Sequence, residues 1–138
     1  MGTNTLYLAL HVEAAVQECR EVSTLLPPGT LVSYQVTVAP VVDFRQGFRS
    51  ATWAPLWEQF FCDWRQLWFN EHIEPPSWVL GDEAIAAGAK GILFPSTMAA
   101  PGVNLVLYVM PMMSSRCSIR RGRYPKTRTR GGEALEQG

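Results

Sequence analysis

The sequence predicts a single α+β domain built around a mixed sheet. Its 138 residues are enough to bury one core. The hydrophobic content is 47% and the formal net charge is zero, a composition typical of a folded globular domain. The predicted elements follow the order β-α-β-β-α-α-β-β. Because strands and helices do not alternate strictly, this order favours a mixed α+β arrangement over a doubly wound parallel sheet.

The first predicted elements are a short strand and an amphipathic helix. Residues 5–10 are mostly apolar and include a tyrosine, as in a short buried strand. Residues 12–22 have helical spacing. On this helix we expect Ala15, Cys19 and Val22 to face the core.

Two short strands are predicted next. A Pro-Pro-Gly turn precedes residues 31–38, whose alternating pattern is typical of a half-buried strand. Pro40 interrupts this pattern, and residues 41–44 resume as a second short strand.

An aromatic-rich helix is predicted over residues 51–69. Its aromatic residues recur at intervals of three and four: Trp53, Trp57, Phe60, Phe61, Trp64 and Trp68. The stripe has two interpretations, a helix packed on the sheet or a platform on which a base or ligand stacks. Packing is favoured because aromatic side chains dominate core burial. Asp63 and Arg65 are expected to form a structural polar pair on the helix surface.

The last predicted elements are a helix and two buried strands. The helix covers residues 77–87, with Ser77 as its N-cap and Gly88 as its end. Residues 90–95 and 104–109 are apolar enough for buried strands and are joined through a Pro-Gly turn.

The sequence lacks the common motifs of phosphate, zinc and serine-hydrolase sites and the patterns of membrane or secreted proteins. It has no glycine-rich phosphate loop, His/Glu zinc pattern or Ser-His-Asp set. Cys19, Cys62 and Cys117 are widely spaced, so we expect idle thiols in a reducing cytoplasm and no metal site. His11 and His72 are predicted to be surface or packing residues. No apolar run reaches the roughly 18 residues of a membrane helix, and no signal-peptide pattern is present, so we expect a cytoplasmic protein.

Charge is distributed unevenly along the chain. Residues 1–110 hold five basic and ten acidic residues, whereas residues 111–138 hold seven basic and two acidic ones. A basic tail can bind nucleic acid. Here no aromatic interleaving or folded basic face supports that interpretation, so direct nucleic-acid binding is not expected.

A series of segments between residues 5 and 109 resembles the RES domain family, the NAD-degrading toxins of bacterial toxin–antitoxin pairs. In order, these segments are residues 6–10 with Glu18, then 27–34, 41–44, 62–65, 75–82, 88–96 and 104–108. The resemblance implies a fold like that of ADP-ribosyltransferases, a split mixed sheet with a NAD cleft between its halves.

The resemblance also implies an activity and its residues. Family members cleave the nicotinamide–ribose bond of NAD by hydrolysis or phosphorolysis, with NAD as substrate and no cofactor. Glu18 matches the family's glutamate and would stabilise the ribosyl cation-like transition state. Ser96 matches its serine and would orient the nicotinamide ribose or amide. Tyr7 matches a tyrosine near the cleft that would stack on nicotinamide or donate a hydrogen bond.

Each of these residues also has a structural interpretation. Taken alone, Glu18 is a solvated helix carboxylate, Ser96 a turn former and Tyr7 a strand core residue. The resemblance favours the functional roles for Glu18 and Ser96. It further implies a partner, a cognate Xre-like helix-turn-helix antitoxin whose C-terminal segment would cover the cleft.

The sequence departs from the family pattern at both ends. The family's arginine lies in a Gly-Arg-aromatic-Asn motif before the Tyr7 strand, and no arginine of this chain occupies the matching position. We therefore expect a RES domain over residues 1–109 that is incomplete at its N-terminus. Residues 110–138 are expected to be a non-native or disordered basic tail, because reading the same nucleotides one base earlier permits the family's usual ending.

Three functions stay open at this point. The first is an enzyme that cleaves NAD with Glu18 and Ser96. The second is a catalytically inactive remnant that at most binds the antitoxin. The third is a nucleic-acid binder that acts through its tail, which would show steep salt dependence.

Overall fold

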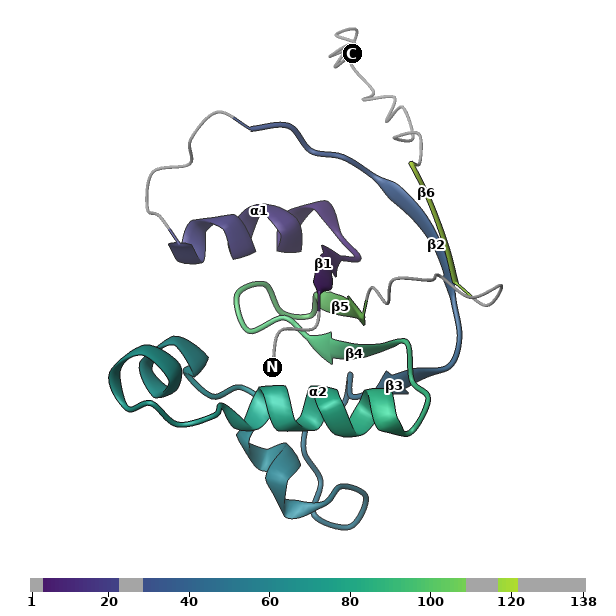
Figure 1. Ribbon diagram of the computed structural model, residues 1–138. Helices are drawn as coiled ribbons and strands as arrows, with labels where there is room; N and C mark the ends of the chain where they lie inside the picture. The colour runs from purple at the N-terminus through teal and green to yellow at the C-terminus, as the bar shows by residue number, and fades with distance from the viewer. Residues whose placement is uncertain (1–3, 23–28, 109–116, 122–138) are drawn as a thin grey trace, which may run out of the picture.

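The computed structural model describes residues 4–22, 29–108 and 117–121 (Figure 1). It confirms the predicted class: a mixed four-stranded sheet in the order β1-β5-β4-β3, a separate two-stranded sheet of β2 and β6, and a few helices. Figure 1 shows α1 and α2 on opposite sides of the four-stranded sheet. In chain order, the elements are β1 (Thr5–Ala9), α1 (Val12–Val22), β2 (Tyr34–Val38), β3 (Val41–Asp43), η1 (Pro55–Gln59), η2 (Gln66–Asn70), α2 (Pro76–Ala86), β4 (Gly91–Pro95), β5 (Val103–Tyr108) and β6 (Cys117–Arg121).

The four-stranded sheet is held by one parallel and two antiparallel ladders. β5 is its centre and pairs antiparallel with β1 and β4, whereas β3 pairs parallel with β4. The sheet face toward α2 carries the main core, a cluster of six buried residues: Phe44, Trp57, Leu80, Ala84, Ile92 and Val106. Close pairing of β4 with β5 requires Gly91, because a Cβ there would collide with the carbonyl oxygen of Val106.

Helix α2 begins one residue earlier than predicted, and its cap differs. Pro76 is the first helical residue and Pro75 is the N-cap, with no side-chain capping bond, so the prediction of Ser77 as N-cap was wrong. Proline fits the first helical position because its φ is already helical and its missing N–H would lack an intrahelical partner there. The predicted end is confirmed, since Gly88 follows the C-cap with a φ of +87°.

Helix α1 has the predicted extent, but a different stripe faces inward. Ala14 is buried, whereas Cys19, predicted to face the core, is exposed. The side chain of Val22 lies outside the described residues. The physical reason is close approach: Ala14 packs against the chain at Gly102, where a Cβ would lie 3.1 Å from the Ala14 Cβ. Glu18 follows Ala14 by one turn and therefore lies on the same inward stripe.

The long aromatic helix is not formed. Instead, a 3₁₀ turn at Pro55–Gln59 and a π-helical turn at Gln66–Asn70 are separated by irregular chain. Asp63 contributes to the break, because its carboxylate accepts a hydrogen bond from the Gln66 N–H at 3.1 Å and so starts a new turn. The predicted pair of Asp63 with Arg65 is also wrong, since the guanidinium of Arg65 lies over the Trp64 ring at 4.6 Å.

Strands β2 and β6 pair antiparallel, with Tyr34 opposite Arg121 and Val38 opposite Cys117. β2 starts at Tyr34, three residues later than the alternating pattern predicts. β6 falls inside the segment expected to be a disordered tail, so five residues of that segment form a strand. The rest of the tail, and the predicted boundary at residue 109, lie outside the described residues.

Candidate active site

Three polar side chains meet where β4 ends and β5 begins, and we call them the Glu18 cluster: Glu18, Ser96 and Asn104. Glu18 comes from the second turn of α1, Ser96 directly follows β4, and Asn104 is the second residue of β5. The Ser96 hydroxyl donates to Glu18 Oε1 at 2.7 Å, and the Asn104 amide donates to the same oxygen at 2.8 Å. These bonds join residues 78 and 86 positions apart, so the cluster exists only in the folded chain.

The hydroxyl of Ser96 has no bonding capacity left. Besides donating to Glu18, its oxygen accepts the backbone N–H groups of Met98 at 3.3 Å and Ala99 at 3.1 Å. A serine hydroxyl has one donor and two lone pairs, and these three bonds use all of them. Ser96 is 5% exposed. It is therefore a fixed donor that holds the carboxylate, which differs from the expectation that it would itself orient the substrate.

Asn104 is the member of the cluster that the sequence prediction missed. It is 8% exposed and donates to Glu18, whereas its own carbonyl oxygen Oδ1 is buried with no hydrogen-bond partner among the described residues. One signal was present in the sequence. A single asparagine precedes five apolar or aromatic residues of a predicted buried strand, and a polar residue in such a place needs a hydrogen-bonding reason.

Glu18 is half-buried, and only one of its two oxygens is committed. Both donors of the cluster converge on Oε1, and no donor within the described ranges reaches Oε2. A carboxylate held in this way has one oxygen fixed by the protein and the other available to a ligand. Such a group can stabilise a developing positive charge or accept a hydrogen bond from a sugar hydroxyl.

Tyr7 lies on β1 and is 69% exposed, so it is not the core residue of the structural interpretation. The register places Tyr7 opposite Val106 and Ala9 opposite Asn104. Residues opposite each other share a face, so Tyr7 and Asn104 are diagonal neighbours on β1 and β5. The structure therefore brings Tyr7 next to the Glu18 cluster, although no hydrogen bond joins them among the described residues.

Tyr108 is the other diagonal neighbour of Tyr7 on this face. Its ring packs at Gly81 of α2, where a Cβ would lie 3.1 Å from the phenol oxygen. Burial, with smaller contributions from Tyr7 and Asp82, raises the pKa of Tyr108 to about 12. The phenol therefore stays neutral throughout the physiological pH range.

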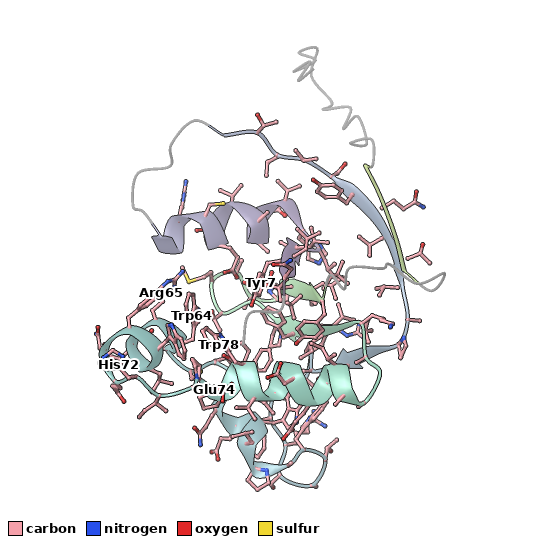
Figure 2. The ribbon with its side chains drawn as sticks, viewed as in Figure 1. Tyr7, Trp64, Arg65, His72, Glu74 and Trp78 are labelled. Carbon is pink, nitrogen blue, oxygen red and sulfur yellow. The ribbon has the colours of Figure 1, made fainter. Side chains whose placement is uncertain are left out.

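A second surface of note is formed by the chain between η1 and α2. We call it the aromatic surface: Phe61, Trp64, Trp68, Phe69 and Ile73, all exposed. Figure 2 shows Trp64 and Arg65 on this segment, with Trp78 at the start of α2. The rings of Trp64 and Trp68 lie 6.1 and 4.9 Å from that of Trp78. Trp68, Phe69 and His72 line a cavity of about 290 Å³, and His72 has a φ of +57°.

The other charged groups of the described residues include one ion pair at the surface. Asp43 and Arg45 form an exposed ion pair at 2.6 Å, and the hydrogen bonds from Arg45 lower the pKa of Asp43 to about 2. In the part of the chain that the structure describes, no three His, Cys, Asp or Glu side chains are placed to hold a metal ion. Among the helices described, none is both long and apolar enough to cross a membrane.

Comparison with known proteins gives one match. The family model of the RES domain matches residues 1–127, which include the Glu18 cluster, Tyr7 and strand β6. No curated protein and no solved structure matches the chain. Since the match covers nearly the whole sequence, the chain belongs to the RES domain family.

Proposed function

We propose that this domain cleaves the bond between nicotinamide and ribose in NAD. The observation that supports the proposal best is the fixed carboxylate of Glu18, which Ser96 and Asn104 hold through Oε1, while Oε2 has no donor among the described residues. Family membership supports the same activity, because the segments between residues 5 and 109 resemble NAD-degrading toxins and Glu18 and Ser96 match the family's glutamate and serine.

The chemistry needs little more than a positioned carboxylate. When the C1′–N bond breaks, both electrons go to the ring nitrogen, the positively charged pyridinium leaves as neutral nicotinamide, and positive charge develops on the ribosyl group. The Glu18 carboxylate stabilises this charge, and its free Oε2 accepts a hydrogen bond from a ribose hydroxyl. Water then gives ADP-ribose and a proton, or inorganic phosphate gives a ribosyl phosphate. NAD is the substrate and no cofactor takes part.

Ser96 and Tyr7 have supporting roles in this proposal. Ser96 acts as a positioning residue, since its hydroxyl is fully used in holding Glu18 and the turn that follows β4. Tyr7 is exposed beside Asn104 and would stack on the nicotinamide ring. A dinucleotide also needs a cationic group for its pyrophosphate. For that role neither Arg45 nor Arg65 is at hand in this structure, because Arg45 is already paired with Asp43 and Arg65 lies over Trp64.

The test is loss of NAD in the presence of the full chain, with Glu18→Gln as the key variant. We expect cleavage by the native chain and a loss of at least about a thousandfold in Glu18→Gln, because a neutral amide cannot stabilise the developing charge. Glu13→Gln is the matched control, since Glu13 is an exposed glutamate in the first turn of the same helix. Equal rates for Glu18→Gln and Glu13→Gln would refute the role of Glu18.

A second candidate function is binding of the antitoxin without catalysis, and the aromatic surface favours a protein partner. An exposed group of large apolar side chains usually marks a contact surface. The resemblance makes an Xre-like antitoxin the expected partner. Co-purification with a candidate antitoxin tests this, and we expect Trp68→Ser with Phe69→Ser to weaken it. Binding without any NAD loss would support the inactive remnant.

A further inference from the structure

The orientation of the Asn104 amide is set by Glu18. A carboxylate oxygen accepts hydrogen bonds, so the group that faces Oε1 at 2.8 Å must be the Nδ2 donor. Turning the amide by 180° would place two acceptors against each other. Oδ1 therefore points away from the Glu18 carboxylate.

This places an unsatisfied acceptor beside the proposed catalytic carboxylate. Asn104 Oδ1 is the one buried side-chain oxygen or nitrogen that has no partner in the described part of the chain. A buried carbonyl without a donor is unfavourable, and an apolar residue of the same shape would avoid the problem. The arrangement is understandable if a bound ligand supplies the missing donor after the groups that cover Oδ1 move aside.

The position of Oδ1 limits which ligand group can reach it. The oxygen and nitrogen of one amide are roughly 2.3 Å apart by covalent geometry, and a donor would lie about 2.9 Å from the oxygen. The donor therefore sits within a few ångströms of Glu18, near the scissile bond. Tyr7, on the same sheet face and diagonal to Asn104, is placed to cover a planar ring there.

We propose that Asn104 determines specificity at the nicotinamide end of the substrate, with Oδ1 accepting a hydrogen bond from the carboxamide NH₂ of the ring. This inference rests on the proposed cleavage of NAD. Two kinds of donor lie near the scissile bond, the ribose hydroxyls and the carboxamide. Glu18 Oε2, which no donor of the described residues reaches, takes the hydroxyl, and this leaves the carboxamide for Asn104.

The experiment compares NAD with 3-acetylpyridine adenine dinucleotide, in which a methyl group replaces the NH₂ and the rest of the dinucleotide is unchanged. We expect the native chain to prefer NAD by about tenfold or more in kcat/KM, because a site built to bond a donor rejects an analogue that lacks it. In Asn104→Leu, which keeps the size of the side chain, this preference should fall to near one.

Ser96→Ala is the matched control for indirect effects. Ser96 donates to the same Glu18 oxygen but has no acceptor left for a ligand. We expect Ser96→Ala to slow both dinucleotides equally and to keep the preference for NAD. If Asn104 only holds Glu18, Asn104→Leu should also slow both dinucleotides equally and keep the preference for NAD. That outcome would overturn the inference. So would equal rates of the native chain on both dinucleotides, which would assign the missing donor to ribose.

Binding measurements separate this inference from the proposed function. If the native chain cleaves neither dinucleotide, the cleavage proposal fails, and titrations of free nicotinamide and 3-acetylpyridine followed by NMR decide the inference. Tighter binding of nicotinamide by the native chain, with the difference lost in Asn104→Leu, would support a carboxamide site. Equal binding of both compounds by the native chain would overturn it.

Discussion

The Glu18 cluster and the aromatic surface use their side chains in opposite ways. The cluster is polar but enclosed, with Ser96 5% exposed, and hydrogen bonds from residues far away in the sequence fix its atoms. The aromatic surface is apolar but open, with Phe69 64% exposed, and comes from one short stretch of chain that includes the π-helical turn η2. A buried polar group and an exposed apolar group both run against the usual distribution. Each arrangement agrees with the proposal made for it, chemistry for the Glu18 cluster and partner contact for the aromatic surface.

The largest expected effect is on stability, and it compares a buried tryptophan of the core, Trp57, with an exposed one of the aromatic surface, Trp68. Trp57 is 9% exposed and packs against Phe44 at a ring distance of 5.0 Å, whereas Trp68 is exposed. We expect Trp57→Ala to lower the free energy of unfolding by about 3–5 kcal/mol and Trp68→Ala by about 1 kcal/mol or less. Urea unfolding followed by circular dichroism measures both. Similar losses for the two variants would show that the aromatic surface belongs to the core.

Ser96→Ala tests whether the Glu18 cluster also stabilises the fold. Removing the hydroxyl leaves two backbone N–H groups without their acceptor and leaves Glu18 Oε1 with the bond from Asn104 alone. We therefore expect a loss of about 1–3 kcal/mol in the free energy of unfolding. Asn104→Leu removes an unsatisfied acceptor together with one donor, so we expect a smaller change. Chemical unfolding compares the two variants, and a larger loss in Asn104→Leu would contradict the assignment of bonds.

The smallest expected effect is a loss of stability at alkaline pH, and it tests the burial of Tyr108 on β5. In the folded state the pKa of Tyr108 is raised to about 12. The contribution of its neutral phenol to the free energy of unfolding is therefore fully present below the unfolded pKa of about 10 and is lost as the pH rises toward 12. The side chain is partly exposed, so we expect a change of the order of 1 kcal/mol. Thermal unfolding between pH 8 and 11 should show this loss, and Tyr108→Phe should reduce it. An unchanged pH dependence in Tyr108→Phe would assign the loss to other groups.

Sequence patterns predicted the strands of the four-stranded sheet and the helices α1 and α2 better than the aromatic segment between β3 and α2. The strands near residues 5–10, 90–95 and 104–109 are apolar over four or more residues, and each lies within one or two residues of its predicted place. The aromatic helix failed because periodicity does not account for local competition, here Pro55 and the carboxylate of Asp63.

The site was predicted in part. The resemblance singled out Glu18 and Ser96, and the structure joins them by a hydrogen bond of 2.7 Å. Their roles in catalysis stay predictions. Asn104 was missed because in the sequence it resembles the polar edge of a strand, and only the three-dimensional structure shows which atom of its amide lacks a partner.

The oxygen of Ser96 serves two structures at once. It accepts the N–H groups that close the turn after β4, and it donates to the carboxylate on α1. The conformation of that turn and the position of Glu18 are therefore mechanically coupled through a single atom. A contact at residues 97–101 that opens the turn would free the Ser96 hydroxyl to rotate and would leave Asn104 as the remaining donor to Glu18 Oε1, so it would change the support of the carboxylate without touching it.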